Sequence, residues 1–316
     1  MSKGRFRRLG RTGLRVSEIG LGTVELGLEY GIAAEATPLK PSRADAAKVL
    51  NQALDRGINF IDTARVYGDS EEIIGEALKS RRQEYVLCSK VTCSGYKGSG
   101  TGALKAHMTS SIHQSLRALQ TDVIDLMQLH SPPAENIRRG ELGDILQEFQ
   151  RAGCIRFLGA TTYGEEAALA ALEDGRYDCL QIAYNVLDRE PEARVLPLAQ
   201  SKDVAVVVRS VLLKGALTHR YRSLPAGLEE LQSAVEKTAA IASGESVSLP
   251  EFAYRFVLAH PAVSTALVGT AQVDELKAAL EYCARGALSS QCQADVRQVE
   301  IKDRRLLNPG NWPPLQ

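Results

Sequence analysis

Metal-binding and disulfide patterns are missing from this chain of 316 residues. Its cysteines are scattered and form no C-x-x-C pair, so neither a zinc site nor a disulfide framework is indicated. The six cysteines are Cys88, Cys93, Cys154, Cys179, Cys283 and Cys292. We therefore predict no bound metal, and reduced thiols of the kind found in cytoplasmic proteins.

An excess of charge of one sign is missing as well. Lys plus Arg number 38 and Asp plus Glu number 38, which gives a net charge of zero. Proteins that bind nucleic acids or anionic membranes favour a basic surface, so the balance argues against both as partners. No apolar run approaches the ~20 residues that span a bilayer, and the basic start MSKGRFRRLGRTG is not followed by the apolar region of a signal peptide. We expect a cytoplasmic protein, a monomer or small homo-oligomer, with a small-molecule partner.

Short apolar runs rich in β-branched residues alternate with longer amphipathic stretches along the whole chain. The expected strands are residues 19–23, 59–63, 85–91, 123–130, 155–161, 179–185, 204–210 and 265–269. The expected helices are residues 43–56, 70–80, 103–119, 140–152, 165–174, 191–201, 228–242, 249–259 and 273–283. Apolar strands that alternate with helices indicate a parallel sheet buried on both faces.

Eight such units predict a closed (β/α)8 TIM barrel, with residues 1–316 forming a single domain. A doubly wound open sheet is the alternative, but it would normally carry a Gly-rich turn after its first strand. Here Gly20-Leu21-Gly22-Thr23 is followed by Val24-Glu25, so G-x-G-x-x-G is not completed. Residues 5–16 are expected to form a small hairpin across the barrel floor, and the Pro-rich tail from residue 306 to be irregular.

Four polar side chains follow or end three neighbouring strands. They are Asp62, Tyr67, Lys90 and His130. The active site of such a barrel lies at the carboxyl ends of its strands, so these side chains should meet at one mouth. Each alone has an ordinary explanation, such as capping, packing or a hydrogen bond to a backbone carbonyl. Together they indicate a set that handles a proton, because a buried Asp and a buried Lys require each other.

The four residues suggest a specific chemistry. A tyrosine phenol has a pKa near ~10, and an adjacent ammonium group lowers it. Asp62 would hold Lys90 charged, and His130 would donate a hydrogen bond to a carbonyl oxygen. Tyr67 would protonate that oxygen while a hydride reaches the carbon. Because protein side chains supply no hydride, the scheme requires a nicotinamide.

Longer motifs surround these residues. D-T-A-R-V-Y-G covers residues 62–68, S-K-V holds Lys90, D-L-M-Q-L-H ends in His130, and R-x-L-G-R-T-G-L-x-V-S-x-I-G-L-G-T runs from Arg7 to Thr23. Together they resemble the aldo-keto reductase family over essentially the whole chain. The resemblance implies a (β/α)8 barrel, a catalytic tetrad of Asp, Tyr, Lys and His at the four positions above, and NAD(P)H-dependent reduction of an aldehyde or ketone, or the reverse alcohol oxidation.

The resemblance also implies a set of cofactor contacts. The nicotinamide would contact Thr161, Thr162, Gln181 and Arg209. The segment 210–215, with Ser210, Leu212 and Gly215, would contact the pyrophosphate, and Gly22 and Thr23 are further cofactor residues. The family's Ser-Asn pair reads Thr161-Thr162 here, which removes an amide. The position that stacks on the nicotinamide, often aromatic in the family, reads Arg209, whose guanidinium plane can also stack on a ring.

At the adenosine end, members that prefer NADPH resemble P-K-S-x-x-x-x-R-x-x-x-N. The corresponding positions here are Gly269, Thr270, Glu275 and Ala279, so the Lys becomes Gly and the Arg becomes Glu. A carboxylate repels a 2′-phosphate and accepts a hydrogen bond from a 2′-hydroxyl. The cofactor is thus NADPH or NADH: the family favours NADPH and the local sequence favours NADH. Lys277, Arg209 or Lys214 could compensate for the missing cations.

Two polar, Gly-rich loops are expected to line the substrate pocket. One contains Tyr30 and the other Tyr96 and Lys97, which suits a sugar or another hydroxylated carbonyl compound. Two other functions stay open. Lys90 could be the Schiff-base nucleophile of a barrel lyase, although a neighbouring carboxylate keeps an amine protonated. Alternatively, the chain could be a non-catalytic subunit that senses a bound nucleotide.

Overall fold

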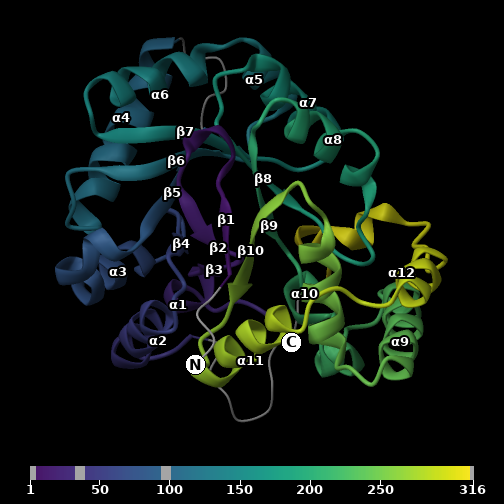
Figure 1. Ribbon diagram of the computed structural model, residues 1–316. Coiled ribbons are helices and arrows are strands. Elements are labelled where there is room, and N and C mark those ends of the chain that lie inside the picture. Colours follow the sequence, from purple (N-terminus) through teal and green to yellow (C-terminus); the bar gives the residue numbers. More distant parts are fainter. Residues whose placement is uncertain (1–4, 33–39, 94–100, 314–316) are drawn as a thin grey trace.

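The computed structural model describes residues 5–32, 40–93 and 101–313. Eight parallel strands close into a barrel in chain order, with the last strand paired to the first (Figure 1). They are β3 (Ile19–Gly22), β4 (Phe60–Asp62), β5 (Val86–Thr92), β6 (Ile124–His130), β7 (Ile155–Thr161), β8 (Cys179–Ala183), β9 (Ala205–Arg209) and β10 (Val263–Gly269). The predicted (β/α)8 TIM barrel is therefore confirmed; that residues 1–316 form one domain stays a prediction.

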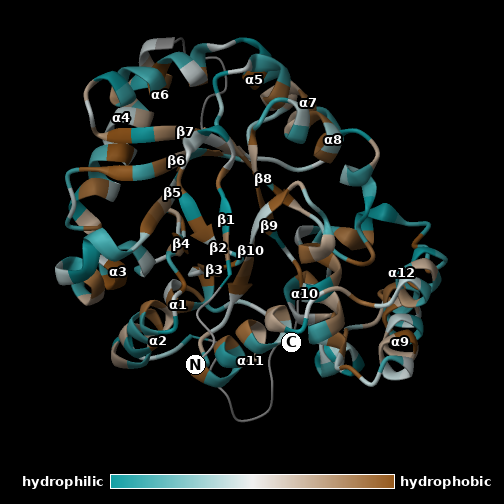
Figure 2. Ribbon diagram, viewed as in Figure 1, coloured by the Kyte–Doolittle hydropathy of each residue, from teal (hydrophilic) through white to brown (hydrophobic). Residues whose placement is uncertain are grey.

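Helices surround the barrel and alternate with its strands. They are α1 (Val24–Gly27), α2 (Arg43–Asp55), α3 (Ser70–Leu78), α4 (Thr101–Ala118), α5 (Ala134–Arg138), α6 (Glu141–Arg151), α7 (Glu165–Asp174), α8 (Val195–Ser201), α9 (Glu229–Gly244), α10 (Leu249–Ala259), α11 (Val273–Ala284) and α12 (Ser290–Arg297). Hydrophobic and hydrophilic segments alternate along them in Figure 2, as expected for helices with one face on the barrel. Serine caps set three of the starts, at α2, α10 and α12. Ser42 accepts from the Asp45 N–H, Ser248 from the Glu251 N–H and Ser289 from the Cys292 N–H.

Short 3-10 helices fill several connections. They are η1 (Gly10–Thr12), η2 (Lys79–Glu84), η3 (Glu190–Glu192), η4 (Leu213–Gly215), η5 (His219–Ser223), η6 (Arg304–Leu307) and η7 (Pro309–Asn311). Two of them shorten helices that the sequence predicts as longer, since η2 replaces the end of the helix expected at 70–80 and η3 the start of the one expected at 191–201. The tail beyond residue 306, predicted as irregular, includes η7 and part of η6.

The predicted hairpin closes the bottom of the barrel. Its strands β1 (Phe6–Arg8) and β2 (Arg15–Ser17) pair antiparallel and lie across the centre of the ring of strands in Figure 1. Leu9 and Val16 are fully buried in an apolar cluster with barrel residues such as Phe60 and Val207. Arg7 also fixes the seam between the first and last barrel strands, because its guanidinium donates to Glu18 Oε1 and to the carbonyl of Val263, both at 2.8 Å.

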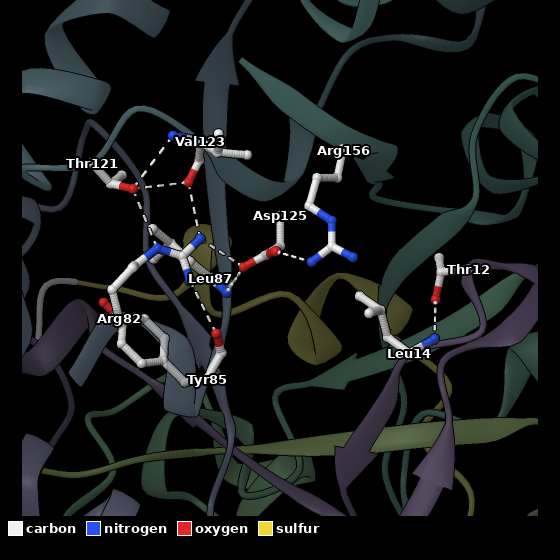
Figure 3. Close-up of polar contacts among 9 residues, drawn as sticks. All are labelled: Thr12, Leu14, Arg82, Tyr85, Leu87, Thr121, Val123, Asp125 and Arg156. Carbon is white, nitrogen blue, oxygen red and sulfur yellow. Dashed lines mark hydrogen bonds and ion pairs between the residues drawn. The ribbon is translucent and has the colours of Figure 1, made fainter. Parts of the chain in front are cut away.

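An acidic residue ties three strands together at the amino end of the barrel. Asp125, near the start of β6, accepts hydrogen bonds from Arg82 and Arg156 at 2.7 Å and from the Leu87 backbone N–H at 2.9 Å (Figure 3). Arg82 also donates to the carbonyl of Tyr85. These contacts lie at the end of the strands opposite to the predicted active site, so they serve stability rather than chemistry.

All six cysteines are free thiols. Within residues 5–32, 40–93 and 101–313, no group of three or more metal-ligating side chains could hold an ion. In the same part of the chain, no helix has both the length and the apolar character needed to cross a bilayer.

Candidate active site

The four predicted catalytic residues meet at the carboxyl ends of the barrel strands. Asp62 ends β4, Lys90 lies in β5, His130 ends β6, and Tyr67 follows β4 in the loop before α3. The strands are parallel and in register, so their ends lie side by side. Lys90 Nζ donates to Asp62 Oδ2 at 2.7 Å and to the Thr63 carbonyl at 3.0 Å. This buried ion pair forms the floor of the site.

The tyrosine and the histidine lie above this ion pair. Lys90 Nζ lies 5.0 Å from the centre of the Tyr67 ring, and the His130 ring meets the Tyr67 ring edge-on with 5.9 Å between centroids. Both side chains are only partly buried, whereas Lys90 is 1% exposed and Asp62 is 2% exposed. A small molecule can therefore contact Tyr67 and His130, while the Lys90 ammonium group lies beneath the Tyr67 ring.

Burial and the Lys90 charge determine how these groups ionise. Burial alone would lower the pKa of Lys90. The negative charge of Asp62 and, to a smaller extent, Tyr67 raise this pKa above its usual value. Lys90 is therefore a stable cation, which opposes the Schiff-base alternative because a nucleophilic amine must lose its proton. Burial, Lys90 and Arg209 together lower the pKa of His130 to about 3, so its ring is neutral near pH 7.

The Lys90 ammonium group lowers the pKa of Tyr67, as expected, but the net shift of that pKa is upward. Burial raises the pKa of Tyr67, and this exceeds the opposing effect of the Lys90 ammonium group. Asp62 raises it further, while Arg209 lowers it. Tyr67 is therefore a protonated phenol at neutral pH, held beside a cation that would stabilise the phenolate once a proton has left.

The loop that carries Tyr67 is held by contacts that the sequence does not reveal. A Cβ atom on Gly27 of α1 would lie 1.9 Å from the Tyr67 carbonyl oxygen, so the loop packs directly onto the α1 backbone. On the other side, Arg65 pairs with the fully buried Glu71 at 2.7 Å, and Ser89 donates to Glu71 at 2.6 Å. These contacts fix the position of the phenol.

A cavity of about 530 Å³ extends from this site along the barrel mouth. Asp62, Tyr67 and His130 line one end, and Gly269, Thr270, Glu275 and Ala279 line the other. The predicted cofactor residues between them also line it: Gly22, Thr23, Thr161, Gln181, Arg209, Ser210, Leu212 and Gly215. Three non-glycine residues with positive φ, including Ser210 and Lys214, cluster in the segment after β9, and such strained backbone concentrates at functional sites.

One predicted cofactor residue lies elsewhere. Thr162 does not line this cavity but faces a neighbouring cavity of about 320 Å³, and its carbonyl accepts a hydrogen bond from Arg209. Thr161 ends β7 and Thr162 is the next residue, and successive side chains at a strand end point in opposite directions. A contact of Thr162 with the cofactor stays a prediction, whereas Thr161 lines the larger cavity. Gln181 lines it too, although its amide N–H₂ donates to Asp62 Oδ1 at 2.8 Å.

The predicted compensating cations differ in position. Lys277 pairs with Asp274 at 2.7 Å and does not line the cavity, and Arg209 lies against Tyr163 towards the catalytic end, with its guanidinium 4.0 Å from the ring centre. Lys214 does line the cavity. Arg220, which the sequence does not indicate, also lines it and pairs with Glu275 at 3.3 Å.

The predicted substrate loops are described only in part. Tyr30 lines the cavity, and its ring lies 5.4 Å from Lys214 Nζ. Tyr96 and Lys97 lie outside the described residues.

Comparisons with known proteins agree with the fold and the placement of these residues. Residues 18–301 match the model of the Aldo/keto reductase family. This chain belongs to that family. The aldo/keto reductase YhdN of Bacillus subtilis is 31% identical over 321 residues, covering 93% of each chain. L-galactose dehydrogenase of Arabidopsis thaliana is 30% identical over 298 residues, covering 88% of this chain and 87% of its own.

The solved structure of aldo-keto reductase AKR11C1 from Bacillus halodurans, in its holo form, is also similar to this aldo/keto reductase. Its TM-score is 0.78 at 28% identity, and the match covers 96% of this chain and 99% of that one. The family generally uses NAD(P)H. The cavity fits a dinucleotide, because its lining extends from Tyr67 and His130 to Glu275 and Ala279. It also has buried polar atoms without a partner among the described residues near both ends, namely His130 Nδ1 and Glu25 Oε2.

Proposed function

We propose that this aldo/keto reductase transfers a hydride between NAD(P)H and the carbonyl carbon of an aldehyde or ketone, or runs the reverse alcohol oxidation. The observation that carries the proposal is the Tyr67 phenol, which lies beside the Lys90 ammonium group and the His130 ring at one end of the large cavity. The nicotinamide, when bound, supplies the hydride.

The chain's own residues supply the proton and the orientation. His130, which is neutral, donates a hydrogen bond to the carbonyl oxygen and polarises it. Tyr67 transfers its phenolic proton to that oxygen as the carbon gains the hydride, so the alcohol forms and a phenolate remains. The Lys90 ammonium group, held by Asp62, stabilises this phenolate. In the reverse direction the phenolate accepts the proton of the alcohol.

The cofactor would contact the residues that line the rest of the cavity. Thr161, Gln181 and Arg209 would hold the nicotinamide end, and Thr270 and Glu275 the adenosine end. A sugar or another hydroxylated carbonyl compound is the proposed substrate class. L-galactose dehydrogenase, whose name specifies a sugar, supports this class, as do the polar Tyr30 and Ser131 at the cavity wall.

The Tyr67→Phe variant tests the proposal. Fluorescence titration with NADH and NADPH should show nucleotide binding unchanged, while turnover falls by about 100-fold or more because general acid catalysis is lost. Tyr85→Phe is the matched control, since Tyr85 precedes β5 at the opposite end of the barrel. Turnover of Tyr67→Phe near that of wild type would remove Tyr67 from the mechanism, and no binding of either nucleotide to the folded protein would refute the proposed function.

A further inference from the structure

A carboxylate lies at the adenosine end of the cavity at a place that the sequence pattern does not indicate. Glu25 belongs to α1, which follows β3, whereas Gly269 ends β10. A Cβ atom on Gly269 would lie 2.5 Å from Glu25 Oε2 and 2.8 Å from Oε1. The Glu25 carboxylate therefore occupies the space into which any side chain at position 269 would project.

One oxygen of this carboxylate lacks a hydrogen-bond donor within the described part of the chain, although the carboxylate also accepts from the Glu25 backbone N–H. Glu25 Oε2 is buried and has no hydrogen-bond partner among the described residues. A second carboxylate, that of Glu275, lines the same end of the cavity, but it already accepts from Thr270 Oγ1 at 2.6 Å and pairs with Arg220. A buried acceptor without a donor is costly, so this end of the cavity is suited to a ligand that brings hydroxyl groups.

We propose that Glu25, together with Glu275, sets the nucleotide preference of this protein by accepting a hydrogen bond from the adenosine ribose hydroxyls and disfavouring a 2′-phosphate. The inference rests on the proposed function, because it concerns the same cavity. Position 269 is where the family pattern for NADPH places a cation. Here a glycine leaves that place open, and a carboxylate from a different part of the chain fills it.

The chemistry of the two ligands explains the choice. A 2′-hydroxyl is a donor and satisfies the unpartnered oxygen of Glu25. A 2′-phosphate dianion offers acceptors alone and places like charges together. Among the described residues, three cationic side chains line the cavity: Arg220 is engaged with Glu275, Arg209 lies against Tyr163, and Lys214 lies near the Tyr30 ring.

The preference should depend on pH, because Glu25 must lose a proton to act in this way. Burial raises the pKa of Glu25 to about 8, with the Glu25 backbone N–H opposing the shift, Glu275 adding to it and Arg220 opposing it. The charged or titratable groups around it come from several elements and are Glu275, Arg220, Lys214, Tyr30 and Tyr254. Hydroxyl donors favour the ionised form, so binding of the unphosphorylated ligand near neutral pH should release a proton.

Calorimetric titration with ADP-ribose and with 2′-phospho-ADP-ribose tests the inference without any reaction. The two ligands differ by the 2′-phosphate alone. For the wild-type protein at pH 9 we expect ADP-ribose to bind about ten-fold more tightly or better, which is a modest effect for one like-charge contact. At pH 6.5 the ratio of the two affinities should be smaller. At pH 7.5 the binding of ADP-ribose should release a proton, which is detected by comparing binding enthalpies in buffers of differing ionisation enthalpy.

Three variants isolate the carboxylate. Glu25→Gln removes its charge at nearly constant shape and should abolish both the tighter binding of ADP-ribose at pH 9 and the proton release. Glu29→Gln removes an exposed carboxylate from the same segment and should change neither. Gly269→Ala displaces the flexible end of Glu25 without deleting it. The ratio of the two ligand affinities should therefore also become smaller in this variant. The ionisation of the 2′-phosphate itself is common to all four proteins and cancels in their comparison.

The outcomes separate the inference from the proposed function. One outcome would overturn the role of Glu25 and leave the dinucleotide site intact. It is that both ligands bind and that the ratio of their affinities is the same in wild type, Glu25→Gln and Gly269→Ala at both pH values. A wild-type protein that prefers 2′-phospho-ADP-ribose at pH 9 would overturn it as well. If folded wild-type protein binds neither ligand, the proposed function fails and the inference fails with it.

Discussion

Replacing Lys90 by methionine should destabilise the protein in a way that depends on pH. Methionine has a similar length but no charge, so Asp62, which is 2% exposed, would keep only Gln181 as a side-chain partner. Removing one partner of a buried ion pair costs about 3–5 kcal/mol. A stranded carboxylate can also take up a proton, which costs an ordinary carboxyl about 4 kcal/mol at pH 7. We therefore expect a loss of about 3–4 kcal/mol at pH 7.

Protonation also sets the sign of the pH effect. At pH 5 the same proton uptake costs about 1.5 kcal/mol, so the deficit of the variant should shrink to about that value as the pH falls. Urea unfolding of both proteins at pH 7 and pH 5 measures this. The double variant Lys90→Met/Asp62→Asn lacks the stranded charge and should recover most of the stability at both pH values. A deficit below 1 kcal/mol at pH 7, or one that grows towards pH 5, would refute the reasoning about the ion pair.

Three further predictions concern the site and its support. Since the pKa of His130 is lowered to about 3 and that of Tyr67 is raised, turnover at saturating nucleotide should be flat from pH 5 to pH 8, and a limb near pH 6.5 would contradict the neutral histidine. Gly27→Ala forces the Tyr67 carbonyl to move and should lower turnover more than about ten-fold, whereas Gly102→Ala meets open space and should leave it unchanged. Asp125→Ala removes the hydrogen-bond acceptor of the Leu87 N–H, so it should lower the free energy of unfolding in urea by about 1–3 kcal/mol and leave turnover normal. Reduced turnover in the folded variant would contradict the stability role.

The sequence predicted the barrel and its mouth because both depend on local signals. Apolar β-branched runs mark the strands, and a parallel barrel brings all strand ends to one face, so Asp62, Lys90 and His130 could be grouped without coordinates. Helix α12 was missed because Cys292 and Val296 are its only buried residues, too few for an amphipathic pattern.

Features that depend on tertiary packing escaped prediction. Glu25 meets Gly269 only because β3 pairs with β10, and no local pattern marks that pairing. The place of Thr162 at the neighbouring cavity could not be foreseen from a motif, which records neighbours in sequence but not the direction of a side chain. The net pKa shift of Tyr67 could not be foreseen, because it depends on how far the surrounding residues exclude water.

The seam at which β10 joins β3 has a consequence for the synthesis of the chain. While the ribosome has yet to release residues 263–269, the growing sheet has two open edges, and Arg7 lacks its partner at Val263. Open edges invite pairing with other chains, and contacts between distant residues form slowly. Truncation before β10 should therefore yield an aggregating chain rather than a smaller barrel, and the first residues to leave the ribosome are among the last to find their place.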